Sequence, residues 1–296
     1  MEAFFDKYRK LTPEEKKKRT RVKRKKGWCA QLRNTQRYLG FRDQELSKED
    51  ASNKDADPLK AKSDLEAFGS TLLNQTVPFA FDKNVVFVCV DVEAYERNQK
   101  KITEIGIATL DTLDLANIAP NKRGSGWMNL IRCRHFRIVE NSHLHNTEFI
   151  NGCASRFDFG TSEWISILEA PQVVAACFRP PYSAPRRYTP HPTDSRDVPR
   201  YGSDIQPQDD RGPKRNIVLL GHDTSQDIEY MRRLGYDVHN LSNLIDTVDT
   251  SVLFRAYKHE MNPRNLGRVL LDLDIDGWNL HNAVNKPRTS CFSSFF

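Results

Sequence analysis

The chain has 296 residues, a net charge of +6, 28% charged residues and 38% hydrophobic residues. This length allows one large or two modest domains with a buried core, and the basic balance suits a polyanionic partner without identifying it. The six cysteines form no Cys-x-x-Cys pair, which argues against a zinc site and a disulfide framework. No apolar stretch is long enough to cross a bilayer, so we expect an intracellular protein, nuclear, cytoplasmic or both, without a membrane partner.

Residues 1–82 are a polar, basic N-terminal region that we expect to be largely disordered or helical. Thr12, followed by a proline and two glutamates, predicts the capped start of a helix. Residues 16–26 then read KKKRTRVKRKK, and the sequence leaves three interpretations open: a solvated helix, a nuclear-localisation signal or a nucleic-acid-binding arm. Apolar side chains beyond this run indicate that the helix docks on the rest of the protein: Trp28, Leu32, Tyr38, Leu39 and Phe41.

The most apolar stretch of the chain, residues 85–90, predicts a strand that is buried on both faces. Asp91 and Glu93 come at its C-terminal end, and the alternation of a strand places both carboxylates on the same face. Two neighbouring carboxylates in such a place need a cation or hydrogen bonds to compensate their charge. The alternative is that the strand ends at Val90 and that both acids are solvated in a loop.

The rest of the core predicts antiparallel strands first and alternating strands and helices later, which is typical of an α/β domain with a mixed sheet. The expected elements, in chain order, are strands at 102–110 and 127–139, a helix from 164 as far as Pro171, a strand at 216–223, a helix at 225–234, a strand at 244–247, and helices at 252–257 and 265–273. Gly106, in the middle of the second strand, indicates a bulge or a close backbone approach. Residues 179–215 hold eight of the 15 prolines, and we expect an exposed, disordered insertion there.

Three short motifs follow one another along this core. Asp91 and Glu93 form an Asp-x-Glu at the end of the first strand, Asp227 lies in the first turn of a helix after a buried strand, and His281 stands in Leu-His-Asn-Ala. In this order the motifs resemble those of the DEDDh branch of RNase H-like 3′–5′ exonucleases. An uncharacterised fungal group of such proteins is the most similar, as the segments HFRIVENSHLHN, INGCASRFDFGTSEW, LLGHDTSQDIEYM and DGWNLHNA indicate.

The resemblance implies an RNase H-like fold, that is, an α/β mixed sheet flanked by helices. The domain would comprise residues 83–178 and 216–286. The proline-rich insertion at 179–215 would interrupt it, and residues 287–296 would form a tail that does not match the family.

The resemblance also implies a site for two Mg²⁺ or Mn²⁺ ions. Asp91 and Glu93 would share the ions, Asp227 would hold the second one, and His281 would be the general base that activates water. Carboxylate oxygens are the ligands that these hard cations prefer, and an imidazole titrates near neutral pH. The implied reaction removes nucleotides from the 3′ ends of single-stranded RNA or DNA.

One position departs from the family pattern. The aspartate expected five residues after His281 is Lys286, and Pro287 interrupts the helix that would carry it. Two explanations stay open, a sequence that is altered after Ala283 or a genuinely inactive relative, and the abrupt loss of similarity favours the first. We expect impaired catalysis in this chain. The alternative function is an inactive RNA- or protein-binding module in RNA processing or export, with RNA-processing proteins as partners.

A third hypothesis is a structural α/β protein in which the motifs coincide by chance and the three carboxylates do not converge. The remaining histidines and aspartates have ordinary explanations. His143 and His145 are assigned to a loop, because no third nitrogen or sulfur ligand is spaced to join them. His222 is assigned to a turn that orients the strand end or Asp227, and two aspartates further on are assigned to caps or to the edge of the site: Asp246 and Asp249.

Overall fold

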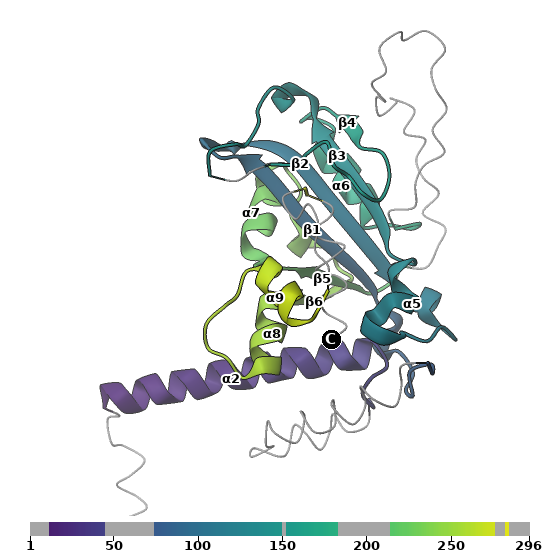
Figure 1. Ribbon diagram of the computed structural model, residues 1–296, viewed down its shortest axis with the longest axis vertical. Coiled ribbons are helices and arrows are strands. Elements are labelled where there is room, and N and C mark those ends of the chain that lie inside the picture. The colour runs from purple at the N-terminus through teal and green to yellow at the C-terminus, as the bar shows by residue number, and fades with distance from the viewer. Residues whose placement is uncertain (1–11, 45–73, 150–151, 183–213, 276–281, 284–296) are drawn as a thin grey trace, which may run out of the picture.

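The computed structural model describes residues 12–44, 74–149, 152–182, 214–275 and 282–283 (Figure 1). Most of the expected insertion and all of the expected C-terminal tail fall outside these ranges, so the disorder proposed for the insertion stays a prediction. His281 and Lys286 fall outside them as well. In the described part of the chain, no helix combines the length and the apolar character that a bilayer span requires.

A six-stranded mixed sheet forms the centre of the protein, with the strand order β4-β3-β2-β1-β5-β6. The strands are β1 (Val86–Tyr95), β2 (Asn98–Asp111), β3 (Arg132–Ile138), β4 (Glu163–Ile165), β5 (Ile217–Gly221) and β6 (Leu244–Asp249). β2 is antiparallel to β1 and β3, and the other neighbours are parallel. Helices cover both faces, so the expected fold class is confirmed: an α/β, RNase H-like mixed sheet (Figure 1).

The main helices are α2 (Pro13–Tyr38), α5 (Ser125–Met128), α6 (Ala170–Cys177), α7 (Ser225–Arg233), α8 (Thr250–Lys258) and α9 (Leu266–Asp272). Short 3₁₀ helices occupy Asp82–Asn84, Thr112–Leu115, Lys122–Gly124, Val139–Asn141 and Val238–Asn240. The predicted elements after the insertion all exist, with ends that differ from the predicted ones by at most two residues.

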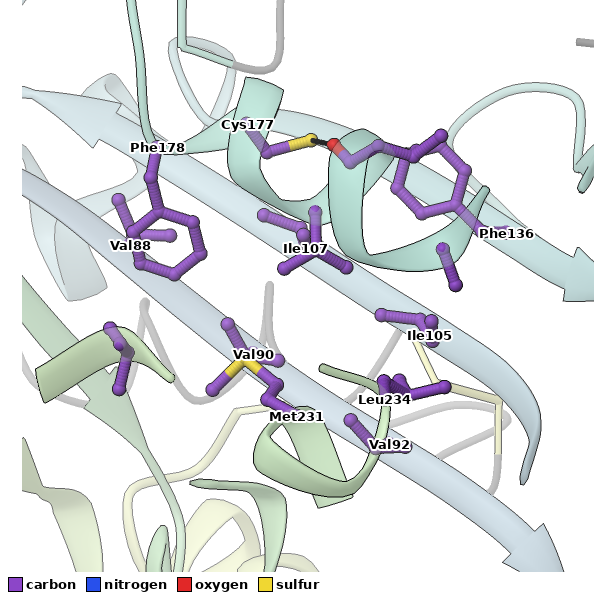
Figure 2. Packing of buried hydrophobic residues seen from close by; sticks show 14 of the residues in the cluster. Val88, Val90, Val92, Ile105, Ile107, Phe136, Cys177, Phe178, Met231 and Leu234 are labelled. Atoms are coloured by element: carbon purple, nitrogen blue, oxygen red, sulfur yellow. Dashed lines mark hydrogen bonds between the residues drawn. The ribbon is translucent and has the colours of Figure 1, made fainter. Parts of the chain in front are cut away.

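The central strand β1 is buried on both faces because its apolar side chains alternate between two clusters. Val88, Val90 and Val92 pack with α6 and α7, where Met231 is one of their neighbours (Figure 2). Phe87 belongs to the opposite cluster, which also contains side chains of α2, α5 and α8. β1 continues as a strand to Tyr95, so the alternative that it ends at Val90 is wrong.

The N-terminal helix α2 begins and docks as the sequence predicts. The Thr12 side chain accepts a hydrogen bond from the Glu15 N–H at 3.2 Å, and the Glu15 carboxylate accepts one from the Thr12 N–H at 2.8 Å. This reciprocal cap satisfies two backbone donors that a helix start otherwise leaves unpaired. Towards the other end of α2, Trp28 and Tyr38 are buried, and α2 packs against α8.

Two predictions between β2 and α6 are wrong. Trp127 belongs to helix α5, and the third strand begins only at Arg132. The indole of Trp127 is fully buried and donates a hydrogen bond to the Ile118 carbonyl at 2.8 Å. This core residue continues the alternating pattern of the strand in the sequence, and the strand was therefore predicted too long.

The second error concerns Pro171, which was expected to end a helix and instead stands in the first turn of α6. A proline is favoured there because the first N–H groups of a helix have no partner within the helix. The residues before it form β4 rather than a helix, and three residues are too short a strand for alternation to reveal.

The expected bulge lies next to the functional motif rather than in the middle of β2. Gly106 pairs in register with Asp91, and the register shifts occur between Glu93 and Tyr95. β2 also begins earlier than the predicted start at residue 102, at Asn98. The irregularity of β1 therefore begins directly after Glu93.

Candidate metal centre

Asp91 and Glu93 lie on one face of the sheet, the face that also buries Phe87. Asp91 is only 4% exposed, and its cross-strand neighbour is Gly106, which has no side chain. Glu93 is half-buried and pairs with Glu104 across the strands. Two carboxylates in directly opposite positions repel each other, so this face of the hairpin has a strong demand for positive charge or donors.

Asp227 reaches the same strand from helix α7. β5 pairs with β1 only as far as Cys89, and beyond that residue no other strand of the described segments pairs with this edge of β1. Asp227 is 8% exposed, and its Oδ1 accepts a hydrogen bond from the Val92 N–H at 3.0 Å. The carboxylate of Asp227 thus binds this edge of β1 at Val92, between Asp91 and Glu93.

Of the four predicted site residues, the structure describes three, and His281 lies outside the described ranges. Asp91 and Glu93 lie on β1, and Asp227 reaches the backbone of the residue between them, so the three residues lie in one part of the fold. Within the described ranges, no group of three or more His, Cys, Asp or Glu side chains is placed so that it could hold a metal ion. Metal binding by these three residues, and the role of His281 as general base, stay predictions.

The segment that follows His281 in sequence returns to this face of the sheet. Asn282 and Ala283 are fully buried. The Asn282 side chain donates to the Cys153 carbonyl at 3.3 Å, and the Ala283 N–H donates to Glu104 Oε2 at 3.5 Å. Glu104 is the cross-strand partner of Glu93, so the chain reaches the neighbourhood of the carboxylates directly after the position of the predicted base.

A buried polar group beside the carboxylates was missed by the sequence analysis. His135 on β3 is fully buried, with Nε2 3.0 Å from Glu104 Oε2 and Nδ1 2.8 Å from Ser162 Oγ. Its Cα pairs with that of Gly106, which in turn pairs with Asp91. The only signal in the sequence was the alternation of β2, which places Glu104 on the face of Asp91. Nothing in the sequence connected it with His135.

A pocket of about 280 Å³ opens beside Glu93 and Glu104. Arg137 lines it, with its guanidinium 4.2 Å from the centre of the Trp164 ring, and burial lowers the pKa of Arg137. Thr103 of β2 and the segment after β3 form the rest of the lining. That segment includes His145, so the assignment of that histidine to a loop is confirmed.

The hairpin turn holds this wall in place. The Glu96 carboxylate accepts hydrogen bonds from the N–H groups of Thr147, Glu148 and Phe149 at 2.9 to 3.0 Å. In addition, the Asn146 side chain accepts from the Glu96 N–H at 2.9 Å and donates to the Ala94 carbonyl at 2.8 Å. The pocket wall is thereby fixed to the end of β1.

The turn before α7 is tied to later elements. The Asp249 carboxylate accepts from the N–H groups of Asp223 at 3.1 Å and of Ser251 at 2.8 Å, so it caps α8 as predicted and fixes the approach to α7. His222 bonds through its two ring nitrogens to Thr250 Oγ1 at 2.8 Å and to the Arg264 carbonyl at 2.9 Å, which fixes the end of β5.

Comparison with known proteins identifies the family of the chain. The family model DEDDh_C, described as DNA polymerase III subunit epsilon-like, C-terminal domain, matches residues 86–289. An uncharacterized nucleolar protein of Schizosaccharomyces pombe is 26% identical over 206 residues, which cover 68% of this chain and 64% of that protein. The chain thus spans slightly less than two thirds of this relative. Since the family model covers more than half of the chain and includes Asp91, Glu93, Asp227 and His281, the protein belongs to the DEDDh family.

Proposed function

We propose that this protein binds the 3′ ends of single-stranded RNA or DNA at the face of Asp91 and Glu93, in a site built for metal-dependent 3′–5′ exonucleolytic hydrolysis. The observation that carries the proposal is the hydrogen bond between Val92 and Asp227, because it brings a third carboxylate to the strand segment that bears the other two. Catalysis in this chain is expected to be weak, since Lys286 stands where the family has its last acidic ligand.

The donor set fits hard divalent cations. Asp91, Glu93 and Asp227 would hold the ions through carboxylate oxygens, the donor type that Mg²⁺ and Mn²⁺ prefer. Two such ions would activate water and stabilise the charge that develops on the leaving 3′ oxygen. The N–H of Val92 orients the Asp227 carboxylate, and Glu104 adds negative charge that attracts cations. His281 would accept the proton of the attacking water.

Trimming of a labelled strand tests the proposal. We would incubate 5′-labelled single-stranded RNA and DNA with Mn²⁺, using the unaltered protein and a Lys286→Asp variant. The variant is expected to produce a ladder of shortened products at least about tenfold faster, because it exchanges a misplaced positive charge for a metal ligand. EDTA should abolish the ladder.

Two substitutions serve as controls in the Lys286→Asp background. Asp91→Asn should remove the activity, whereas Glu229→Gln should leave it unchanged. Glu229 lies on the same helix as Asp227 but is on the surface, where it pairs with Arg232 and Arg233. Equal activity of the Asp91→Asn variant and its parent would contradict the proposal.

The second candidate is a catalytically inactive module that binds RNA or a protein in RNA processing, and the charge of Lys286 specifically favours it. If the Lys286→Asp chain binds single-stranded RNA but never shortens it, the binding module is the correct function. We also propose a nuclear location and RNA-processing partners, because the relative from fission yeast is described as nucleolar. Localisation of a tagged full-length chain tests the first of these points.

A further inference from the structure

Helix α2 divides into two parts of different character. The residues from Trp28 onward lie half-buried or buried on the domain, whereas residues 12–27 are exposed apart from two half-buried side chains, Glu15 and Lys25. The exposed part extends beyond the body of the protein as a rod (Figure 1). At 1.5 Å per residue, it is roughly 22 Å long.

The exposed rod is almost uniformly basic. Nine of the eleven residues at 16–26 are lysine or arginine, and at 100° per residue they point to all sides of the helix. They are Lys16, Lys17, Lys18, Arg19, Arg21, Lys23, Arg24, Lys25 and Lys26. A helix so charged resists its own formation, and the cap at Thr12 together with the docked half offsets that repulsion.

The docked half fixes the direction of the rod. Gln31 donates a hydrogen bond to the Thr247 carbonyl at 2.9 Å, and the Tyr38 hydroxyl lies 3.2 Å from Asp246 Oδ2. The Arg255 guanidinium stacks over the Trp28 ring at 4.6 Å, immediately after the exposed part ends. These contacts hold the helix on β6 and α8, so the charged rod is carried by the domain and not by a flexible tether.

We propose that residues 16–26 of α2 bind the phosphate backbone of double-stranded nucleic acid. The charge matches a duplex, which presents one phosphate per about 1.7 Å of its axis. Single strands are usually bound by aromatic platforms, and residues 12–27 contain no aromatic residue. The inference shares with the proposed function only the premise that the protein binds nucleic acid, and it does not require cleavage.

Duplex binding by the full chain tests the inference. The affinity for a fluorescent 20-base-pair duplex of RNA, and of DNA, is measured by anisotropy in EDTA between 50 and 200 mM salt. The test variant replaces four charges while keeping good helix formers: Lys17→Gln, Arg19→Gln, Arg21→Gln and Lys23→Gln. Its affinity is expected to fall at least about tenfold, and the slope of log K against log salt by about 2, because only one side of the rod faces the duplex.

A matched control removes four exposed charges elsewhere: Lys100→Gln, Lys101→Gln, Lys122→Gln and Lys214→Gln. This control should retain nearly all of the duplex affinity. An equal loss in both variants, or no loss in the α2 variant on either duplex, overturns the inference. Binding of polyglutamate, an acidic polypeptide, is measured in parallel. If the α2 variant binds polyglutamate more weakly but binds both duplexes as before, the inference is also overturned, because the rod would then be a protein-binding surface. Trimming by the Lys286→Asp chain is measured separately, so failure of the nuclease proposal is distinguished from failure of this one.

Discussion

At the scale of single residues, Asp227 has two roles that substitutions can separate. Its carboxylate both satisfies the Val92 N–H on an open strand edge and is a predicted metal ligand. Asp227→Asn keeps a carbonyl oxygen for that hydrogen bond, whereas Asp227→Ala removes the acceptor. A buried donor that loses its partner costs about 1–3 kcal/mol.

We therefore predict that Asp227→Ala lowers the free energy of unfolding by about 1–3 kcal/mol and that Asp227→Asn changes it by much less. Both variants should lose the stabilisation that added Mn²⁺ gives the parent chain. Urea unfolding with and without Mn²⁺ measures both effects. If Asp227→Asn is still stabilised by Mn²⁺ as strongly as the parent, Asp227 is not a ligand.

The residues of the site were predictable to different degrees. Asp91, Glu93 and Asp227 could be found because each belongs to a local motif whose strand or helix is visible in the sequence. Glu104 and His135 could not, because their contact joins two strands whose register no local pattern specifies. A buried histidine looks the same in sequence as an exposed one until its partner strand is known.

At the scale of elements, α2 contains a weak point at the boundary of its two parts. Gly27 lies in the helix interior, directly before the docked half, and a Cβ built there meets nothing within 4 Å. Glycine in a helix interior costs about 0.5–1 kcal/mol relative to alanine. Gly27→Ala should therefore stabilise the exposed part of α2 by about that amount and slow amide hydrogen exchange at residues 16–26. Unchanged exchange there would show that this part is not helical in solution.

The docking of α2 should also depend on pH. Burial, reinforced by the nearby Asp246, raises the pKa of Tyr38 above its ordinary value of about 10. Below about pH 9 the phenol is protonated in both the folded and the unfolded chain, so the full stability is present. Above about pH 10 only the unfolded chain loses the proton, and Tyr38 then lowers the free energy of unfolding by at most about 1.4 kcal/mol per pH unit.

Comparison with Tyr38→Phe isolates this contribution. Tyr182 and Tyr236, whose pKa values burial also raises, contribute in both chains. The variant should therefore lose less stability than the parent between about pH 10 and 11 in urea unfolding. Parallel curves would mean that Tyr38 is exposed in solution.

The elements that the sequence predicted well are those that repeat a pattern over a whole strand or helix, such as β1 and α7. The errors fall where one residue decides the outcome. Trp127 fits the alternation of a strand because a buried aromatic residue is common in strands as well as in helices. Pro171 is compatible with the beginning of a helix as well as with its end. Tertiary packing distinguishes these cases, and the sequence alone does not contain it.

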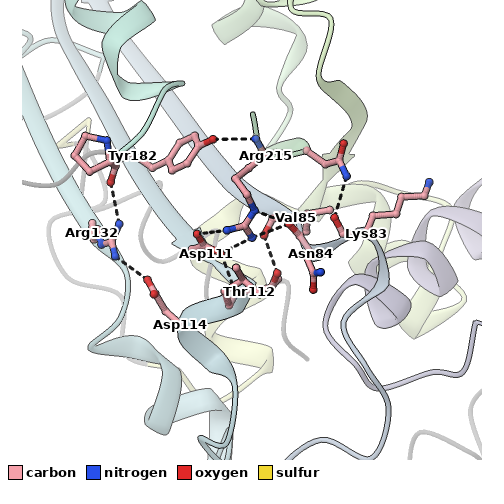
Figure 3. Close-up of polar contacts among 12 residues, drawn as sticks. Lys83, Asn84, Val85, Asp111, Thr112, Asp114, Arg132, Tyr182 and Arg215 are labelled. Carbon is pink, nitrogen blue, oxygen red and sulfur yellow. Dashed lines mark hydrogen bonds and ion pairs between the residues drawn. The ribbon is translucent and has the colours of Figure 1, made fainter. Parts of the chain in front are cut away.

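At the scale of the whole molecule, polar contacts join the two ends of the proline-rich insertion (Figure 3). The Arg215 backbone N–H donates to the Tyr182 hydroxyl at 3.3 Å, and the Arg215 guanidinium donates to both carboxylate oxygens of Asp111 at 2.7 and 2.9 Å. Thr109 donates to the Tyr182 carbonyl at 2.9 Å, and Arg132 donates to the Pro181 carbonyl at 2.9 Å. The chain therefore leaves and re-enters the fold at nearby points that the sheet itself holds.

Replacing residues 183–213 with about ten glycine and serine residues should preserve the fold. The shorter loop should raise the free energy of unfolding by about 1 kcal/mol, because loop-closure entropy depends only on the logarithm of loop length. Circular dichroism and urea unfolding measure both quantities. A loss of several kcal/mol would show that the insertion packs on the domain.

Because Tyr182 and Arg215 are held together by these contacts, the two parts of the domain do not need a covalent link through the insertion. Two separately expressed fragments, one ending after Tyr182 and one starting at Lys214, each contribute strands to a single hydrophobic interior, with β1 and β5 paired across the break. Mixed together, they should reassemble into a non-covalent complex, which makes the protein suitable for a split reporter of its own folding.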